Sequence, residues 1–335
     1  MGERDPVEAR SDGTRDLYDI ATWEPRSALD RLSVKVYGGA VAVGKWIVVL
    51  LALAFTVAIG AFGALSDPFV GALTVLSAIP ALALAAYVYY VDITSGEPIW
   101  LLTATFVLSI FFASFAAVIN SLFSPLSLLG PVGLVLFFYL VVGPVEESVK
   151  LLAVWLYAYR DARFDAVVDG AVYGAFAGLG FAFVENAIYI NRGLEMSPAA
   201  GPETQLAVAG GTAAFRALAG PGHVVYSAFA GYYLGLAKFN PENAGPIVAK
   251  GLLIAAFIHA TYNTLVSFIP SVVSLSFPNV PQFVVFLAFV LIYQGFFGYL
   301  LYRKIARYRA TYRAVRTETE RKGGDVSVDT TEFDS

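Results

Sequence analysis

Apolar residues are grouped along this chain into long runs that are separated by short polar segments. A helix needs about 20 apolar residues to cross the hydrocarbon layer of a membrane. Eight runs approach or exceed this length, at Trp46–Leu65, Val70–Val91, Ile99–Leu122, Leu128–Tyr159, Asp169–Ile190, Leu218–Lys238, Ile247–Phe268 and Phe283–Tyr302. The pattern predicts an all-α fold, a polytopic membrane helical bundle with about eight transmembrane helices.

Composition supports this fold class and narrows the chemistry. Hydrophobic residues make up 58% of the chain, charged residues make up 14%, and the mean hydropathy is +0.67. These values lie far from those of soluble domains. The chain has no cysteine, which excludes disulfides, thiolate metal sites and cysteine nucleophiles. We expect the lipid bilayer as its surroundings and no nucleic acid as a partner.

The polar segments define the ends of the chain and its orientation. We expect residues 1–45 to form an N-terminal tail, residues 46–303 the transmembrane domain, and residues 304–335 a largely disordered C-terminal tail. Cytoplasmic loops retain the excess of Lys and Arg. With the N-terminus inside, the inner segments hold 19 of the 22 Lys and Arg residues, and the outer loops hold only Arg192. This predicts a multi-pass protein of the cell membrane with both termini in the cytoplasm.

Four consecutive apolar runs carry polar residues that are costly in lipid and therefore indicate function. These residues are Glu146, Glu147 and Lys150 in the fourth run, Glu185 and Asn186 in the fifth, His223 in the sixth, and His259 and Asn263 in the seventh. Counting about 1.5 Å per helical residue from the cytoplasmic ends places them within about one turn of one depth. We expect one shared site among the fourth to seventh helices, within residues 128–268.

Each polar residue also has a structural interpretation. Lys150 lies four residues after Glu146 and could simply neutralise it, and lone buried histidines are often satisfied by a carbonyl or carboxylate. Asn186 could bridge helices. Asp169 and Arg216 lie near predicted interfaces, where solvated or snorkelling side chains are the default. Convergence of the other residues at one depth favours a functional interpretation for the set.

Two further patterns concern how the helices pack. Small residues recur every fourth position at 170, 174 and 178, and again at 227, 231 and 235, so each of these helices has a face that allows close approach of a neighbour. The run Leu128–Tyr159 is too long for one perpendicular crossing. Its Gly143-Pro144 pair predicts a kink or a helix restart.

The same polar residues form an ordered series that resembles the motifs of PrsW-type intramembrane proteases, distant relatives of the CAAX prenyl proteases and bacteriocin-processing enzymes. The series is Glu146-Glu147-Ser148-Val149-Lys150, Phe181-Ala182-Phe183-Val184-Glu185-Asn186, Pro221-Gly222-His223 and His259-Ala260-Thr261-Tyr262-Asn263. The resemblance implies a multispanning endopeptidase, either metal-dependent or of the glutamic type. Its expected substrates are membrane-anchored proteins such as anti-sigma factors.

By position, the resemblance makes Glu146, Glu147, Glu185, His223 and His259 active-site residues, with Asn263 in support. The chain departs from the CAAX-type enzymes in the second motif, where those enzymes have a histidine and this chain has Glu185. A prenylated substrate is therefore not implied.

A zinc site is one interpretation of this set. Glu185, His223 and His259 supply one carboxylate and two imidazoles, a ligand set that suits catalytic zinc. Glu146 and Glu147 are then candidate catalytic carboxylates, Asn263 a donor to the oxyanion, and Lys150 and Asn186 supporting residues. A metal-free mechanism stays open, because Glu146 with a histidine could activate water unaided.

The alternative from another class is a proton- or ion-coupled transporter, in which the same Glu and His residues would form a relay. The absence of a visible internal repeat argues against it. The sequence carries no signal for a particular substrate or oligomeric state.

Overall fold

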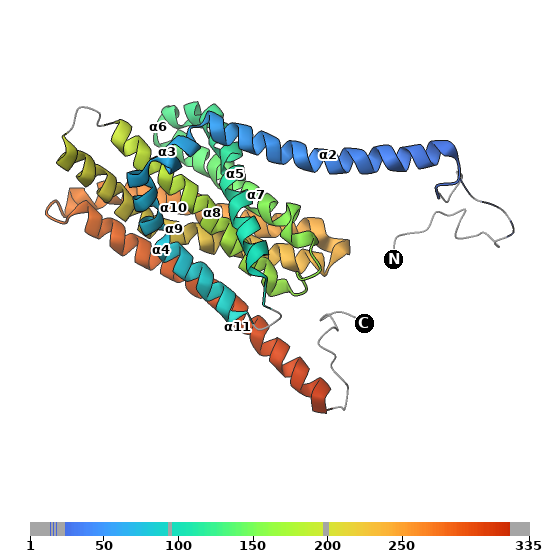
Figure 1. Ribbon diagram of the computed structural model, residues 1–335. Coiled ribbons are helices and arrows are strands. Elements are labelled where there is room, and N and C mark those ends of the chain that lie inside the picture. The colour runs from blue at the N-terminus through green and yellow to red at the C-terminus, as the bar shows by residue number, and fades with distance from the viewer. Residues whose placement is uncertain are drawn as a thin grey trace. The chain divides into compact units, whose positions relative to one another are not determined.

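The computed structural model describes residues 24–92, 96–196 and 201–321, together with positions 14, 16 and 18. Helices dominate these residues (Figure 1). They are α2 (Ala28–Ala58), α3 (Ala61–Ser66), α4 (Pro68–Val91), α5 (Ile99–Phe123), α6 (Gly130–Phe137), α7 (Gly143–Leu156), α8 (Val167–Glu195), α9 (Pro202–Lys238), α10 (Ala244–Ser276) and α11 (Gln282–Arg321). The predicted all-α membrane bundle is confirmed.

The chain divides into two units, residues 1–50 and 51–335. In the first unit the described residues consist mainly of the start of α2. Ser27 and Asp30 cap this helix, since the Ser27 N–H donates to Asp30 Oδ2 at 2.6 Å and the Asp30 N–H donates to Ser27 Oγ at 3.0 Å. The helix therefore begins inside the segment predicted as a tail. The second unit contains the bundle and the candidate site.

Five segments of the described chain are long and apolar enough to cross a membrane, namely Pro68–Val91, Ile99–Arg160, Val167–Glu195, Pro241–Ser276 and Gln282–Val315. The segment Ile99–Arg160 contains two of the predicted spans, because α5 ends at Phe123 and α6 starts at Gly130. The predicted sixth span is the second part of the longer helix α9. These helices make the chain a multi-pass membrane protein.

The first predicted span, Trp46–Leu65, is two helices rather than one. Helix α2 ends at Ala58, Gly60 adopts φ 72°, and α3 starts at Ala61. Glycine has no Cβ and adopts this left-handed conformation without steric cost. A hydropathy pattern contains no such conformational information, which is why the break was not predicted.

The fourth predicted span changes its helix type where the sequence places Gly143 and Pro144. A π-helical turn, Phe138–Val142, joins α6 to α7. Pro144 has no N–H to donate to the preceding turn, so a π turn here costs no additional hydrogen bond at that position. Gly143 lies close to α10, where an added Cβ would be 2.7 Å from the Ala256 carbonyl oxygen. Of the predicted kink or restart, the restart matches the structure, because α7 starts at Gly143.

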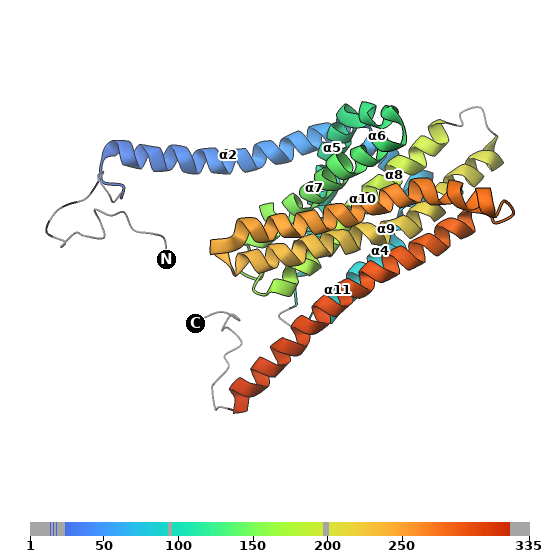
Figure 2. The ribbon, with the colours of Figure 1, turned by 180° about the vertical axis from the view of Figure 1, so that it is seen from behind.

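Helices α8 and α9 pack with their backbones in close approach, and Figures 1 and 2 show them side by side. A Cβ added at Gly170, Gly174 or Gly178 of α8 would overlap the backbone of α9. The atoms it would overlap belong to Gly231, Ser227 and His223 in turn. The small-residue faces predicted from the sequence therefore meet each other, and they hold His223 directly against α8.

This close packing predicts that Gly231→Ala destabilises the bundle. The new methyl group would overlap the carbonyl oxygen of Gly170, and relieving such overpacking costs about 1–3 kcal/mol. Gly211→Ala is the matched control on the same helix, because nothing lies within 4 Å of a Cβ there. We expect the control to stabilise the helix by about 0.5–1 kcal/mol. Thermal unfolding of both variants in detergent tests this, and equal midpoints would contradict the packing argument.

The remaining helices place the site within the bundle. Helix α10 contacts α9 and α7, and α11 contacts α9 and α10 (Figure 2). Helix α11 continues to Arg321, so the segment 304–321, predicted as part of a disordered tail, is helical. The Lys and Arg residues of this segment lower its apolar content, which is why the sequence predicted disorder. Lys and Arg nevertheless favour helix formation. Residues 322–335 lie outside the described part of the chain.

Candidate functional site

The two adjacent glutamates lie in the first turns of α7, directly after the π turn. The side chains of Glu146 and Glu147 are buried, with 7% and 0% of their surface exposed. Lys150 follows one turn later and is also fully buried. Its ammonium nitrogen lies 2.7 Å from Glu147 Oε1 and 4.0 Å from Glu146 Oε2. The lysine therefore pairs mainly with Glu147, whereas the sequence suggested pairing with Glu146.

Hydrogen bonds from three residues hold Glu147. Its Oε1 accepts from Lys150 and from His259 Nδ1 at 2.8 Å, and its Oε2 accepts from the Ser227 hydroxyl at 3.2 Å. Because both oxygens are engaged, Glu147 is poorly placed to act on a substrate. It fixes the His259 ring and leaves Nε2 of that ring with its lone pair.

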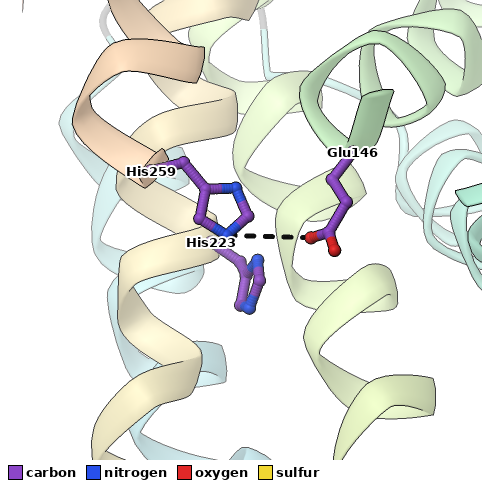
Figure 3. A group of neighbouring side chains, drawn as sticks. All are labelled: Glu146, His223 and His259. Atoms are coloured by element: carbon purple, nitrogen blue, oxygen red, sulfur yellow. Dashed lines mark ion pairs between the residues drawn. The ribbon is translucent and has the colours of Figure 1, made fainter. Parts of the chain in front are cut away.

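Glu146 has a different environment. Its Oε1 accepts a hydrogen bond from the Asn120 side chain of α5 at 3.0 Å. Its Oε2 is buried and has no hydrogen-bond partner among the described residues. That oxygen lies 3.7 Å from His259 Nε2, and Figure 3 shows the two groups facing each other. Glu146 therefore presents one unsatisfied oxygen to the site.

His223 is bonded at both ring nitrogens. The Lys150 ammonium donates to its Nδ1 at 2.9 Å, so the proton of the neutral ring is on Nε2, which contacts Glu185 Oε2 at 2.9 Å. The ring lies nearly perpendicular to that of His259, with centroids 5.1 Å apart. The two histidines of the chain thus lie side by side.

Glu185 of α8 forms an ion pair with Arg216 of α9. The Arg216 Nε also donates to Asn186 Oδ1 at 2.9 Å, and the Asn186 amide donates to Ser77 of α4 at 2.9 Å. Arg216 was expected to snorkel into the interface, but its side chain is only 14% exposed. The buried carboxylate provides the reason, because a charge inside the bundle needs a partner of opposite sign.

Several of these partners, among them Arg216 and Asn120, were not identified as site residues from the sequence. Arg216 precedes His223 by seven residues, which is two helical turns and hence the same face of α9, so spacing could have indicated it. Asn120 lies near the end of a predicted span without charged residues. Asn120 and Glu146 are on different helices, so their spacing in the sequence does not indicate that they are in contact.

A cavity of about 800 Å³ adjoins this network. Its lining includes polar residues from five helices, namely Asn120, Glu146, Glu185, His223, His259 and Asn263. Apolar residues such as Phe137 and Phe286 complete the walls. The volume is within the range of ligand-binding cavities.

The donor atoms suit a transition metal, although the set differs from the one predicted. Glu146, His223 and His259 each offer one ligand atom, and these atoms lie within 4.8 Å of one another. Figure 3 shows the three side chains pointing toward each other. The unsatisfied Glu146 Oε2 and the carboxylate-bonded His259 fit a metal site. His223 would give up one of its two contacts. Glu185, predicted as a ligand, is outside this group and is paired with Arg216.

Comparison with known proteins gives a consistent assignment. The family model described as PrsW family intramembrane metalloprotease matches residues 97–294. Protease PrsW of Shouchella clausii is 30% identical over 189 residues, which cover 56% of this chain and 80% of that protein. Protease PrsW of Bacillus subtilis is 28% identical over 191 residues, which cover 56% of this chain and 79% of that protein.

No solved structure gives a significant match to this chain. The matched region 97–294 contains every residue of the network described above except Ser77. The resemblance seen in the sequence is therefore confirmed, and with it the assignment as an enzyme. The chain belongs to the PrsW family of intramembrane metalloproteases and is a multi-pass membrane protease.

Proposed function

We propose that this protease hydrolyses peptide bonds of membrane-anchored proteins in the 800 Å³ cavity, and that Glu146, His223 and His259 activate the attacking water. The observation that carries this proposal is the buried Glu146 Oε2, which has no hydrogen-bond partner among the described residues and faces His259 Nε2. Single-span proteins, including those of the anti-sigma-factor type, are the expected substrates. The family assignment favours this function over the transporter alternative.

Peptide hydrolysis needs an activated water, a donor to the oxyanion and a proton for the leaving amine. Glu146 Oε2 is free to bind a metal ion or, in a metal-free mechanism, the attacking water, while Asn120 holds Oε1 in place. Glu147 holds His259, and Asn263 lies one turn further along α10 on the cavity wall, where its amide can donate to an oxyanion. Lys150 balances the charge of Glu147 and orients His223.

We further propose that zinc is held by Glu146, His223 and His259, in place of the set with Glu185 that the sequence suggested. One carboxylate and two imidazoles are a common ligand set for catalytic zinc. When bound there, zinc would supply Lewis acidity to water and to the scissile carbonyl. Zinc would replace one of the two contacts of His223, so either Glu185 or Lys150 then orients the ring, and Glu185 is not a ligand.

A cleavage assay tests the proposed function. Detergent-purified protein is incubated with a single-span candidate substrate, and the products are identified by mass spectrometry. Co-purification with an inactive variant supplies candidate substrates from the membrane. A panel of co-purified single-span proteins that remains uncut by the active enzyme would contradict the proposed substrate class.

The proposed orientation, with both termini in the cytoplasm, predicts the side on which substrates are cut. With this orientation, residue counts from the cytoplasmic ends of the helices put Glu146 and His259 slightly to the outer side of the bilayer centre, which supports a site open to the outer half. We therefore expect cleavage in the outer juxtamembrane part of a substrate. Mapping the cut bond by mass spectrometry measures this, and a cut on the cytoplasmic side would contradict either the orientation or the depth.

A further inference from the structure

A second group of carboxylates lies far from the active site, where the end of α4 and the residues just before α5 meet the start of α8. Asp92 caps the end of α4, Glu97 precedes α5, and Asp169 lies in the first turn of α8. One carboxylate oxygen from each lies within 4.8 Å of the others. Glu97 and Asp169 are buried, with 2% and 0% of their surface exposed.

Two buried polar side chains at this point lack partners, which indicates a ligand rather than a chance grouping of acids. Both oxygens of Glu97 are buried, and no hydrogen-bond donor among the described residues reaches them. The hydroxyl of Tyr173, a residue with 0% exposure, is likewise without a partner there. Tyr173 follows Asp169 by one turn of α8, and helical side chains lean toward the N-terminus. Its hydroxyl is therefore directed toward the acidic group.

Nearby groups neutralise this charge only in part. Asp169 Oδ2 accepts hydrogen bonds from the backbone N–H groups of Asp165 and Ala166, each at 2.8 Å. Lys238 is the nearby cation, but its ammonium donates to the carbonyl oxygens of Tyr159, Asp161 and Phe164. An ammonium has three donors, so these bonds use all of them.

Asp92 is also at the C-terminal end of a helix, where the helix dipole disfavours an anion. Burial and the neighbouring carboxylates raise the pKa of Glu97 to about 10. Without a cation this carboxyl would hold a proton. The group therefore requires either a proton or a cation.

We propose that Asp92, Glu97 and Asp169 form a second metal site that binds a hard divalent cation, Ca²⁺ or Mg²⁺, and ties the end of α4 and the start of α5 to the start of α8. Calcium binds oxygen ligands at about 2.3–2.6 Å, so oxygens up to about 5 Å apart can share one ion. Carboxylates without imidazole or thiolate favour Ca²⁺ and Mg²⁺ over zinc. Asp169 and Glu185 are about 24 Å apart along α8, so the two sites are separate.

The test is the thermal unfolding of full-length protein that has been purified in detergent and freed of metal by chelation. Ca²⁺ or Mg²⁺ alone is then added, and the midpoint is recorded. At a concentration about 100 times the Kd, we expect the midpoint to rise by roughly 5 °C. Glu97→Gln and Asp92→Asn should abolish this rise. Asp92 is only half-buried, so Asp92→Asn still tests the site if Glu97→Gln fails to fold.

Two controls separate this site from others. Glu242→Gln makes the same chemical change at an exposed position and should keep the full rise. His259→Gln alters the active site and should also keep it. An equal rise in Glu97→Gln and Asp92→Asn would overturn the proposal, as would no rise in the wild-type protein. If the wild-type protein shows no rise, a proton on Glu97 replaces the cation. The free energy of unfolding should then fall as pH rises from about 4.5 toward about 10.

Discussion

Glu146→Gln is expected to abolish proteolysis and leave the fold intact. The amide keeps the shape of the side chain and can still accept the hydrogen bond from Asn120. It cannot take a proton from water, and it is a poor metal ligand. Loss of a group that transfers a proton in the reaction typically costs 10²–10⁴-fold, so we expect cleavage to slow by about 10³-fold or more.

The measurement compares initial cleavage rates of wild type, Glu146→Gln and the matched control Glu203→Gln, an exposed residue in the first turn of α9. Thermal unfolding in detergent checks the fold, and the midpoint of Glu146→Gln should not decrease because the variant removes a buried charge. A variant that cleaves at near wild-type rate would show that Glu146 is structural.

Removal of the metal is expected to have the second large effect. Purified protein should contain about one zinc per chain, and chelation should reduce cleavage by about 100-fold or more, because the Lewis acid is lost. Zinc added back should restore the rate. The measurement combines elemental analysis of the protein with cleavage assays before chelation, after it and after zinc addition.

Glu147→Gln provides a matched test of the same site. Glu147 contacts His259 Nδ1 rather than the proposed metal, and removal of such an orienting carboxylate typically costs 10–100-fold in metal affinity. The variant should therefore bind zinc more weakly and need more zinc for full activity. A fully active preparation with far less than one metal per chain would instead identify a glutamic-type protease.

The sequence was sufficient to predict that the four polar helices meet. Residue counts along helices placed Glu146, Glu185, His223 and His259 at one depth, and the structure brings their side chains into contact. Depth in the bilayer is a distance along the helix axis, and each helical residue advances it by about 1.5 Å. It can therefore be read from the sequence without knowledge of the packing.

The pairing of the side chains could not be predicted in this way. The choice between Glu146 and Glu185 as the carboxylate that groups with both histidines depends on the rotation of each helix and on Arg216, which forms an ion pair with Glu185. The acidic group around Glu97 was missed for a related reason. Asp169 lies far from Asp92 and Glu97 in the chain, and those two residues are near a helix end, where charged residues are normally solvated.

The π turn Phe138–Val142 has a consequence for the alignment of helix faces. Each residue advances an α-helix by about 100°, so the additional residue in a wider turn rotates every following side chain relative to those before it. The face that carries Tyr139 toward Thr261 is therefore out of phase with the face that carries Glu146. Deletion of one residue in this turn would leave the hydropathy profile unchanged. It would nevertheless rotate either Glu146 or helix α6 by about a quarter of a turn. The π turn therefore determines the direction in which the Glu146 side chain points.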